Sequence, residues 1–163
     1  MLRITKAAKH AEQWLQSIQS SNSEIRNLRD MGLMFCETIF TQNDTLKSLR
    51  TTESSYDYPK GFPLSLLQME RNDILSLAMN MSFSKSKFKL SSKQQKEWAQ
   101  IIGGISLSYA RYGDVPVVAA LVRIAKLLEF DNSLLVDAHS FLMDQQEPDG
   151  TFGTFRKGME SMQ

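Results

Sequence analysis

The sequence predicts an all-α fold built from antiparallel helix pairs, and three observations support this prediction. Apolar residues recur at three- and four-residue steps along most of the 163 residues, as they do in amphipathic helices. No stretch of useful length alternates between apolar and polar residues, so no β-sheet is expected. The connections between the later helices are short, which favours antiparallel neighbours.

The length and composition fit one globular domain with its own hydrophobic core. Apolar residues make up 42% of the chain and charged residues 23%. We therefore expect a single all-helical domain over residues 1–163. A turn-rich stretch at residues 51–62 divides it into two candidate sub-units, residues 1–50 and 63–155.

The N-terminal part predicts two helices and a shorter helical piece. The first helix is expected over residues 4–20. The sequence SSNSE at residues 20–24 offers several N-cap side chains for a second helix, which runs to about Phe40. A short helical piece follows around Leu46 and Leu49. The inward faces are expected to be Ile4, Ala7, Ala8, Ala11, Trp14, Leu15 and Ile18 in the first helix, and Ile25, Leu28, Gly32, Phe35, Cys36 and Ile39 in the second.

The middle of the chain predicts two longer helices separated by a connector. Pro63 suits the first position of a helix that reaches roughly Met81. A polar, basic connector covers residues 82–92, and the next helix is expected from about Ser92 to Tyr112. The inward residues are expected to be Leu64, Leu67, Ile74, Leu75, Ala78 and Met81, and then Trp98, Ile101, Ile102, Ile105, Leu107 and Tyr109.

Two more helices are expected near the C-terminus. Asp114 is the predicted N-cap of the first, with Pro116 in its first turn. This helix is apolar almost all round from Val115 to Leu128, which indicates burial on most sides. The last helix starts at Asn132 and Ser133; its inward residues are expected to be Leu134, Leu135, Ala138, Phe141 and Leu142, and its outward residues Asp137, Ser140 and Asp144.

The stretch QQEPDGTFG at residues 145–153 predicts a tight turn that ends the last helix. Pro148 disfavours helical geometry at Glu147. Asp149 can then accept backbone N–H groups, and Gly150 can adopt a positive φ. We expect Gln146 to bond backbone groups of the turn and Phe152 to pack on the apolar side of the helix. The turn is therefore interpreted as a structural staple.

This stretch resembles the Q-x-x-D-G-x-aromatic repeat of the α/α-toroid superfamily, which includes squalene and hopene cyclases and the β subunits of protein prenyltransferases. Gln146, Asp149, Gly150 and Phe152 match the motif. The preceding segment YGDVPVVAALVRIAKLLEF is similar to a buried inner helix followed by an outer helix that carries the motif. The resemblance covers about residues 92–155 and implies a partial or divergent toroid-like domain, the alternative being an irregular helical bundle.

The catalytic motifs known in that superfamily are not found in this sequence. The chain has neither the D-x-D-D box of the cyclases nor the D-D-x-x-D box of magnesium-dependent terpene synthases. The Asp, Cys and His zinc ligands of the prenyltransferases have no counterpart in matching context, and neither do the Cys and His ligands of lanthionine cyclases. We therefore expect no metal and no cofactor.

Few side chains are candidates for chemistry or ligand binding. His139 lies on the flank of an apolar helix face without a partner at helical spacing, which favours a histidine at the edge of the core. His10 is expected at the surface, and Cys36 in the core as a small apolar residue. Tyr56 and Tyr58 are candidates for lining an apolar ligand pocket, although core packing explains such aromatic residues equally well.

Charge and cysteine content exclude several classes of protein. The net charge of +1 does not suggest binding to nucleic acid. A basic run (Lys85, Lys87, Lys89, Lys93 and Lys96) is interpreted as a solvated connector, the alternative being a contact with phosphate or an acidic partner. A single cysteine excludes a disulfide framework and fits the reducing cytoplasm. The longest apolar stretch, Val115–Val122, is too short to span a membrane.

The architecture predicts an accessory or binding domain of a biosynthetic or modification pathway. Its ligand would be a peptide, a protein partner or a lipophilic small molecule. One alternative is an isoprenoid- or peptide-modifying enzyme (a lyase, cyclase or transferase) that acts in a hydrophobic cavity. Another is a small helical interaction or immunity protein. A lone toroid-type unit leaves an apolar edge uncovered, so a homo-oligomer or a partner subunit is expected.

Overall fold

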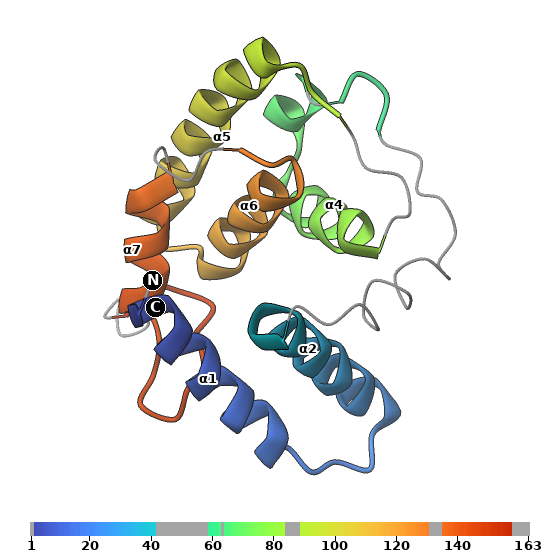
Figure 1. Cartoon of the computed structure of the whole chain (residues 1–163), viewed down its shortest axis with the longest axis vertical. Helices are drawn as coiled ribbons and strands as arrows, with labels where there is room; N and C mark the ends of the chain where they lie inside the picture. Colours follow the sequence, from blue (N-terminus) through green and yellow to red (C-terminus); the bar gives the residue numbers. More distant parts are fainter. Residues whose placement is uncertain (1, 42–58, 63, 84–88, 131–134, 158–163) are drawn as a thin grey trace.

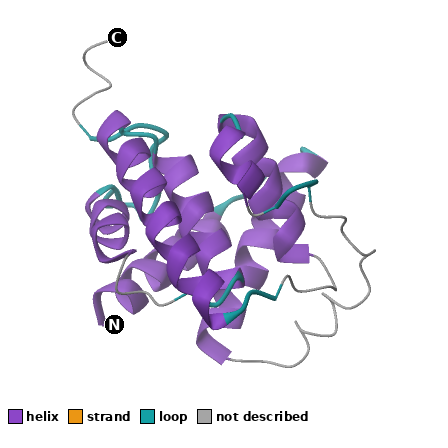
Figure 2. Cartoon of the chain, turned by 90° about the horizontal axis from the view of Figure 1, so that it is seen from above, coloured by secondary structure: helices purple, strands orange, loops and turns teal. Residues whose placement is uncertain are grey.

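A computed structural model of the chain describes residues 2–41, 59–62, 64–83, 89–130 and 135–157, and this part of the chain is all-α, as predicted. Figure 2 shows helices joined by loops, without a strand in the described part. The elements are α1 (Leu2–Ser17), α2 (Ser23–Thr41), the 3-10 helix η1 (Leu64–Gln68), α4 (Arg71–Phe83), α5 (Ser92–Tyr112), α6 (Val115–Leu127) and α7 (Val136–Asp144).

Helix α6 is the centre of the core. It packs against α4, α5 and α7, while α1 and α2 form a hairpin beside this group (Figure 1). Val117, Val118, Leu121 and Ile124 are completely buried, which confirms the burial predicted from the apolar run. Val122 is only half-buried.

Asp114 joins the start of α6 to the start of α4. Its Oδ1 accepts a hydrogen bond from the Val117 backbone N–H at 3.3 Å, which confirms the predicted N-cap. Its Oδ2 accepts from Arg71 Nε at 2.7 Å. Just before it, the chain leaves α5 at Gly113, whose φ of 78° is left-handed. A tight α5–α6 connection and a cross-helix ion pair thus meet at one residue.

The helix predicted from Pro63 to Met81 is wrong as a single element. The described chain forms η1, breaks at Met69 and Glu70, and restarts as α4. The break has a local cause: Asp73 Oδ2 accepts the Glu70 N–H at 3.1 Å, which caps a new helix. The register changes at the break, so Leu64 and Leu67 are exposed rather than inward, whereas Ile74, Ala78 and Met81 are buried as predicted.

Helix α5 has the predicted bounds. Its start is a capping box, in which Ser91 and Gln94 bond each other's backbone N–H groups. Trp98 and Ile102 are buried as predicted. Leu107 is exposed, contrary to prediction, because the buried stripe of α5 runs along positions 98, 99, 102, 103 and 106 and leaves position 107 beyond its edge.

The α1–α2 hairpin is closely packed at one point, but part of its apolar surface is exposed. Asn22 Oδ1 caps α2 by accepting the Glu24 N–H at 2.9 Å, within the segment predicted to supply the N-cap. A Cβ atom at Gly32 would lie 2.9 Å from Leu15 Cδ1, so the two helices approach closely there. The prediction that Ile25 and Leu28 face inward is wrong: both are exposed, because this part of α2 has α1 as its main neighbour.

Helix α7 has the predicted faces, since Leu135 and Ala138 are buried while Asp137, Ser140 and Asp144 are exposed. Lys89 is exposed and outside helix, as expected of the connector. Several predictions fall outside the described residues: the helical piece around Leu46 and Leu49, Tyr56, Tyr58, Pro63, Lys85, Lys87, and the start of the last helix at Asn132, Ser133 and Leu134.

Candidate functional site

The turn after α7 has the local structure that the sequence predicts. Gly150 adopts a φ of 96°, and its N–H donates to the Glu147 carbonyl at 2.9 Å. Gln146 Nε2 donates to the Gly150 carbonyl at 3.2 Å, which confirms a bond from this glutamine to the turn. The Glu147 N–H donates to the Thr151 carbonyl at 2.8 Å, so the turn closes on itself.

Asp149 is tied to the turn through Thr151. Its Oδ1 accepts from the Thr151 N–H at 3.0 Å and from the Thr151 hydroxyl at 2.7 Å. These two bonds, the hydroxyl first, lower the pKa of the Asp149 carboxyl, because they favour its charged form. Asp149 is therefore ionised at neutral pH and serves as a hydrogen-bond acceptor for the turn.

The same turn docks on the first helix of the chain, which the sequence alone did not reveal. Gln146 Nε2 also donates to the Ala7 carbonyl at 2.8 Å. A Cβ atom at Gly150 would overlap the His10 carbonyl oxygen and lie 2.8 Å from the His10 carbonyl carbon. Glycine at position 150 thus permits both the left-handed turn and the close approach to α1.

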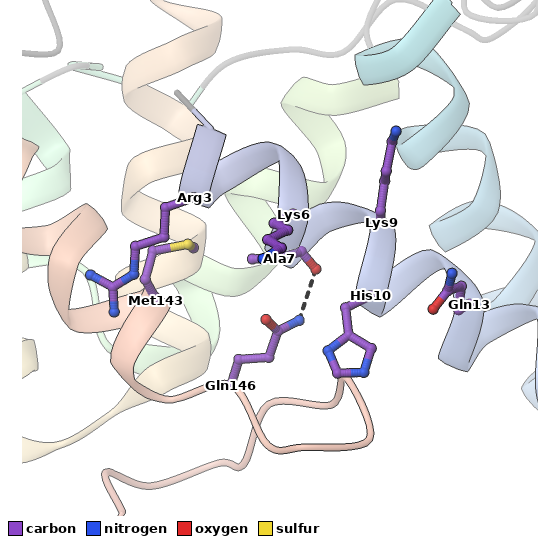
Figure 3. A pocket seen from close by; sticks show the side chains of 8 residues that line it. All are labelled: Arg3, Lys6, Ala7, Lys9, His10, Gln13, Met143 and Gln146. Carbon is purple, nitrogen blue, oxygen red and sulfur yellow. Dashed lines mark hydrogen bonds between the residues drawn. The ribbon is translucent and has the colours of Figure 1, made fainter.

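A basic groove lies between α1 and the end of α7. Its volume is about 500 Å³, and Figure 3 shows its side chains spread along α1, with Gln146 reaching the Ala7 carbonyl. The lining contains three cationic side chains and no carboxylate. The lining residues, which we call the basic groove, are Arg3, Lys6, Ala7, Lys9, His10, Gln13, Met143 and Gln146.

Two carboxylates stand beside the groove: Asp149 of the turn interacts electrostatically with His10, and Asp144 pairs with Arg3. Arg3 Nη2 donates to Asp144 Oδ1 at 2.6 Å, and both side chains are well exposed. An exposed ion pair of this kind contributes little to stability, roughly 0–1 kcal/mol. Arg3 can therefore exchange Asp144 for another anion at small cost.

An apolar hollow adjoins the basic groove. Its volume is about 310 Å³, and it is lined by the start of α6, the end of α7 and the segment that follows the turn. Phe152 forms part of its wall together with Leu142 and Met143 of α7, and the ring remains 39% exposed. The lining residues, which we call the apolar hollow, are Val115, Pro116, Ala119, Leu142, Met143, Phe152, Gly153 and Thr154.

His139 lies apart from both cavities. It is half-buried on α7, and its Nε2 is a buried atom without a hydrogen-bond partner. Burial lowers the pKa of its imidazole, because the charged form loses solvation. The ring is therefore mainly neutral at pH 7. This position agrees with a histidine at the edge of the core.

The structure does not bring the other predicted candidates together. His10 is half-buried and lines the basic groove, although the sequence placed it simply at the surface. Cys36 lies within α2, but its side chain is outside the described part. Lys93 and Lys96 are exposed on α5. In the described ranges, no group of three His, Cys, Asp or Glu side chains could hold a metal ion.

The basic groove was not predicted from the sequence, although the spacing of residues in α1 indicates one side of it. Arg3, Lys6, His10 and Gln13 recur at three- and four-residue steps, which places them on one face of a helix. That stripe is visible in the sequence. Its partner, the end of α7, is not, because the contact from Gln146 to Ala7 joins residues 139 positions apart.

No family model matches the chain, and neither does any curated protein or solved structure. No helix among the described residues has the length and apolar character needed to cross a membrane.

A comparison of Gly150 with Gly61 separates the effect of a positive φ on stability from the effect of the contact with α1. Gly61 also has a left-handed φ, 79°, but a Cβ there would meet nothing within 4 Å. Gly61→Ala should lower the free energy of unfolding by about 1 kcal/mol through φ strain alone. Gly150→Ala should lower it by roughly 2–4 kcal/mol, because the methyl group also displaces the turn from α1.

Urea denaturation of both variants measures the difference. Equal losses in the two variants would show that the approach of Gly150 to His10 contributes nothing to the fold.

Proposed function

We propose that this chain is a helical binding domain whose ligand carries negative charge and lies in the basic groove. The observation that carries the proposal is the groove itself, in which Arg3, Lys6 and Lys9 line about 500 Å³ without a carboxylate among the lining residues. Cationic side chains along one groove attract anions. The volume falls within the range of small-molecule sites.

The surroundings of the groove support binding of an anionic group at this place. Arg3 offers a guanidinium whose ion pair with Asp144 is exposed. Lys6 is exposed on the same helix face, one turn further along. The whole chain has a net charge of only +1, which favours a small ligand or a short acidic segment over a nucleic acid.

The resemblance to the α/α-toroid superfamily supports a place in a biosynthetic or modification pathway. It concerns the α6–α7 pair and the turn with Gln146, Asp149, Gly150 and Phe152. In this proposal the chain is an accessory unit of such a pathway, and the turn builds the groove rather than performing chemistry. The hydrogen bonds of Gln146 and Asp149 support that structural role.

The proposal includes a second copy of the chain as a partner. Tyr112 is 74% exposed at the end of α5, and the exposed Phe155 lies nearby, since the Arg156 N–H donates to the Gly113 carbonyl at 2.8 Å. Neighbouring exposed aromatic side chains are typical of interfaces.

Sedimentation equilibrium tests whether the chain forms this dimer. The chain should form a dimer at micromolar concentration, and Tyr112→Glu should weaken the dimer at least tenfold. Leu107→Glu, at an exposed apolar position of the same helix, is the matched control and should leave the dimer intact. A monomer at all concentrations, or an equal effect of both variants, would refute the dimer.

The basic groove can be tested with inorganic phosphate as the probe. In an NMR titration of the labelled chain, amide signals of residues 3–13 and 143–151 should shift. Lys6→Glu should weaken phosphate binding by about threefold to tenfold, through loss of one cation and gain of one anion. Lys93→Glu changes another exposed lysine, on α5, and should have no such effect.

Two outcomes would refute the binding function. In one, phosphate leaves the α1 signals in place up to high millimolar concentration. In the other, Lys6→Glu and Lys93→Glu weaken binding equally, so that the groove holds no localised anion.

A further inference from the structure

The basic groove and the apolar hollow share a wall. Met143, near the end of α7, lines both of them, so the two cavities lie within one side chain of each other. Both are also bounded by residues of the same turn, Gln146 on the groove side and Phe152 on the hollow side. Methionine is unbranched and adapts its conformation easily, which allows it to turn aside and connect the two spaces.

We propose that the two cavities form one bipartite site for a single-tailed amphiphilic anion. A phosphate or carboxylate head occupies the basic groove beside Arg3 and Lys6, and an alkyl tail enters the apolar hollow across Met143. This inference rests on the binding function proposed above and names its ligand class. It goes beyond that function because the tail reaches a cavity that contains no charged side chain.

The hollow has the features of a tail site. Its lining comes from Val115, Pro116 and Ala119 of α6, Leu142 and Met143 of α7, and the ring of Phe152. Phe152 is 39% exposed at its wall, so a tail in the hollow would cover part of this ring. A volume of about 310 Å³ corresponds to about ten groups the size of a water molecule or a methylene.

The dimensions favour an alkyl tail over a protein helix. An amphipathic helix presents a row of side chains at i, i+3, i+4 and i+7, and it needs a long apolar groove. Here the apolar space is small, about 310 Å³, and a basic groove lies on the other side of Met143. An apolar cavity next to a basic one matches a ligand with a tail of up to about ten carbons and one charged head.

Octyl phosphate, below its micelle concentration, is the probe for the full-length chain. It should bind at least tenfold more tightly than inorganic phosphate, since each buried methylene contributes about a threefold to fourfold gain in affinity. Amide signals of residues 115–119 and 152–154 should shift with octyl phosphate and stay in place with phosphate. Octanol, which lacks the anionic head, should bind at least tenfold more weakly than octyl phosphate.

Two variants assign the tail to the hollow. Ala119→Phe, at an exposed position, should fill the hollow and remove the gain from the octyl chain, while the affinity for phosphate stays unchanged. Phe152→Ala should reduce the same gain by removing part of the wall. Lys6→Glu should weaken phosphate and octyl phosphate by the same factor.

The outcomes separate this inference from the binding function. If phosphate binds and the octyl chain adds nothing, or if its gain survives both Ala119→Phe and Phe152→Ala, the bipartite site is refuted and the anion groove stands. If phosphate and octyl phosphate both fail to bind, both proposals fall. Binding to vesicles that contain phosphatidic acid, without binding of monomeric octyl phosphate, would also overturn the bipartite site, because the contact would then be with a membrane surface.

Discussion

The close approach of Gly150 to the His10 carbonyl determines how the two ends of this chain meet. A methyl group at position 150 would overlap that carbonyl oxygen, so the backbone of the turn lies directly on α1. Gln146 fixes the register of the contact, because its one amide group donates both to the turn and to the Ala7 carbonyl. Without this contact, α1 would keep its hairpin with α2, but the basic face of α1 would have no opposite wall.

The turn can hold α1 only because the helix that precedes it, α7, is itself anchored to the core. Helix α7 packs on α5 and on the buried helix α6, and Gln145 continues that anchoring: it is buried, and its Oε1 accepts the Lys157 N–H at 2.9 Å. The segment after the turn also reaches the start of α6, since the Arg156 N–H donates to the Gly113 carbonyl, and there Asp114 ties α6 to Arg71 of α4. The groove and the hollow are thus built between helices at the edge of a packed core, and spaces between helices are among the usual places of ligand sites.

Sequence reasoning succeeded where the determining interactions are local. The Asp114 cap, the start of α5 and the turn at Pro148–Gly150 each depend on residues within a few positions of one another. It failed at Glu70, where the Asp73 cap interrupts a continuous apolar pattern, and at Ile25 and Leu28, because periodicity cannot tell how many neighbours a helix has. The groove could not be predicted, since it needs α1 and α7 to be side by side, and only the basic stripe on α1 was visible.

Hydrogen exchange of the α1 amides tests most directly the claim that the turn fastens α1 to the core. In Gly150→Ala, the amides of residues 6–12 should exchange at least tenfold faster than in the unaltered chain, and they should stay less protected than those of α6, because α1 opens locally at a lower free energy than the core unfolds. Unchanged exchange in α1, or α1 amides that are as well protected as those of α6, would contradict the account.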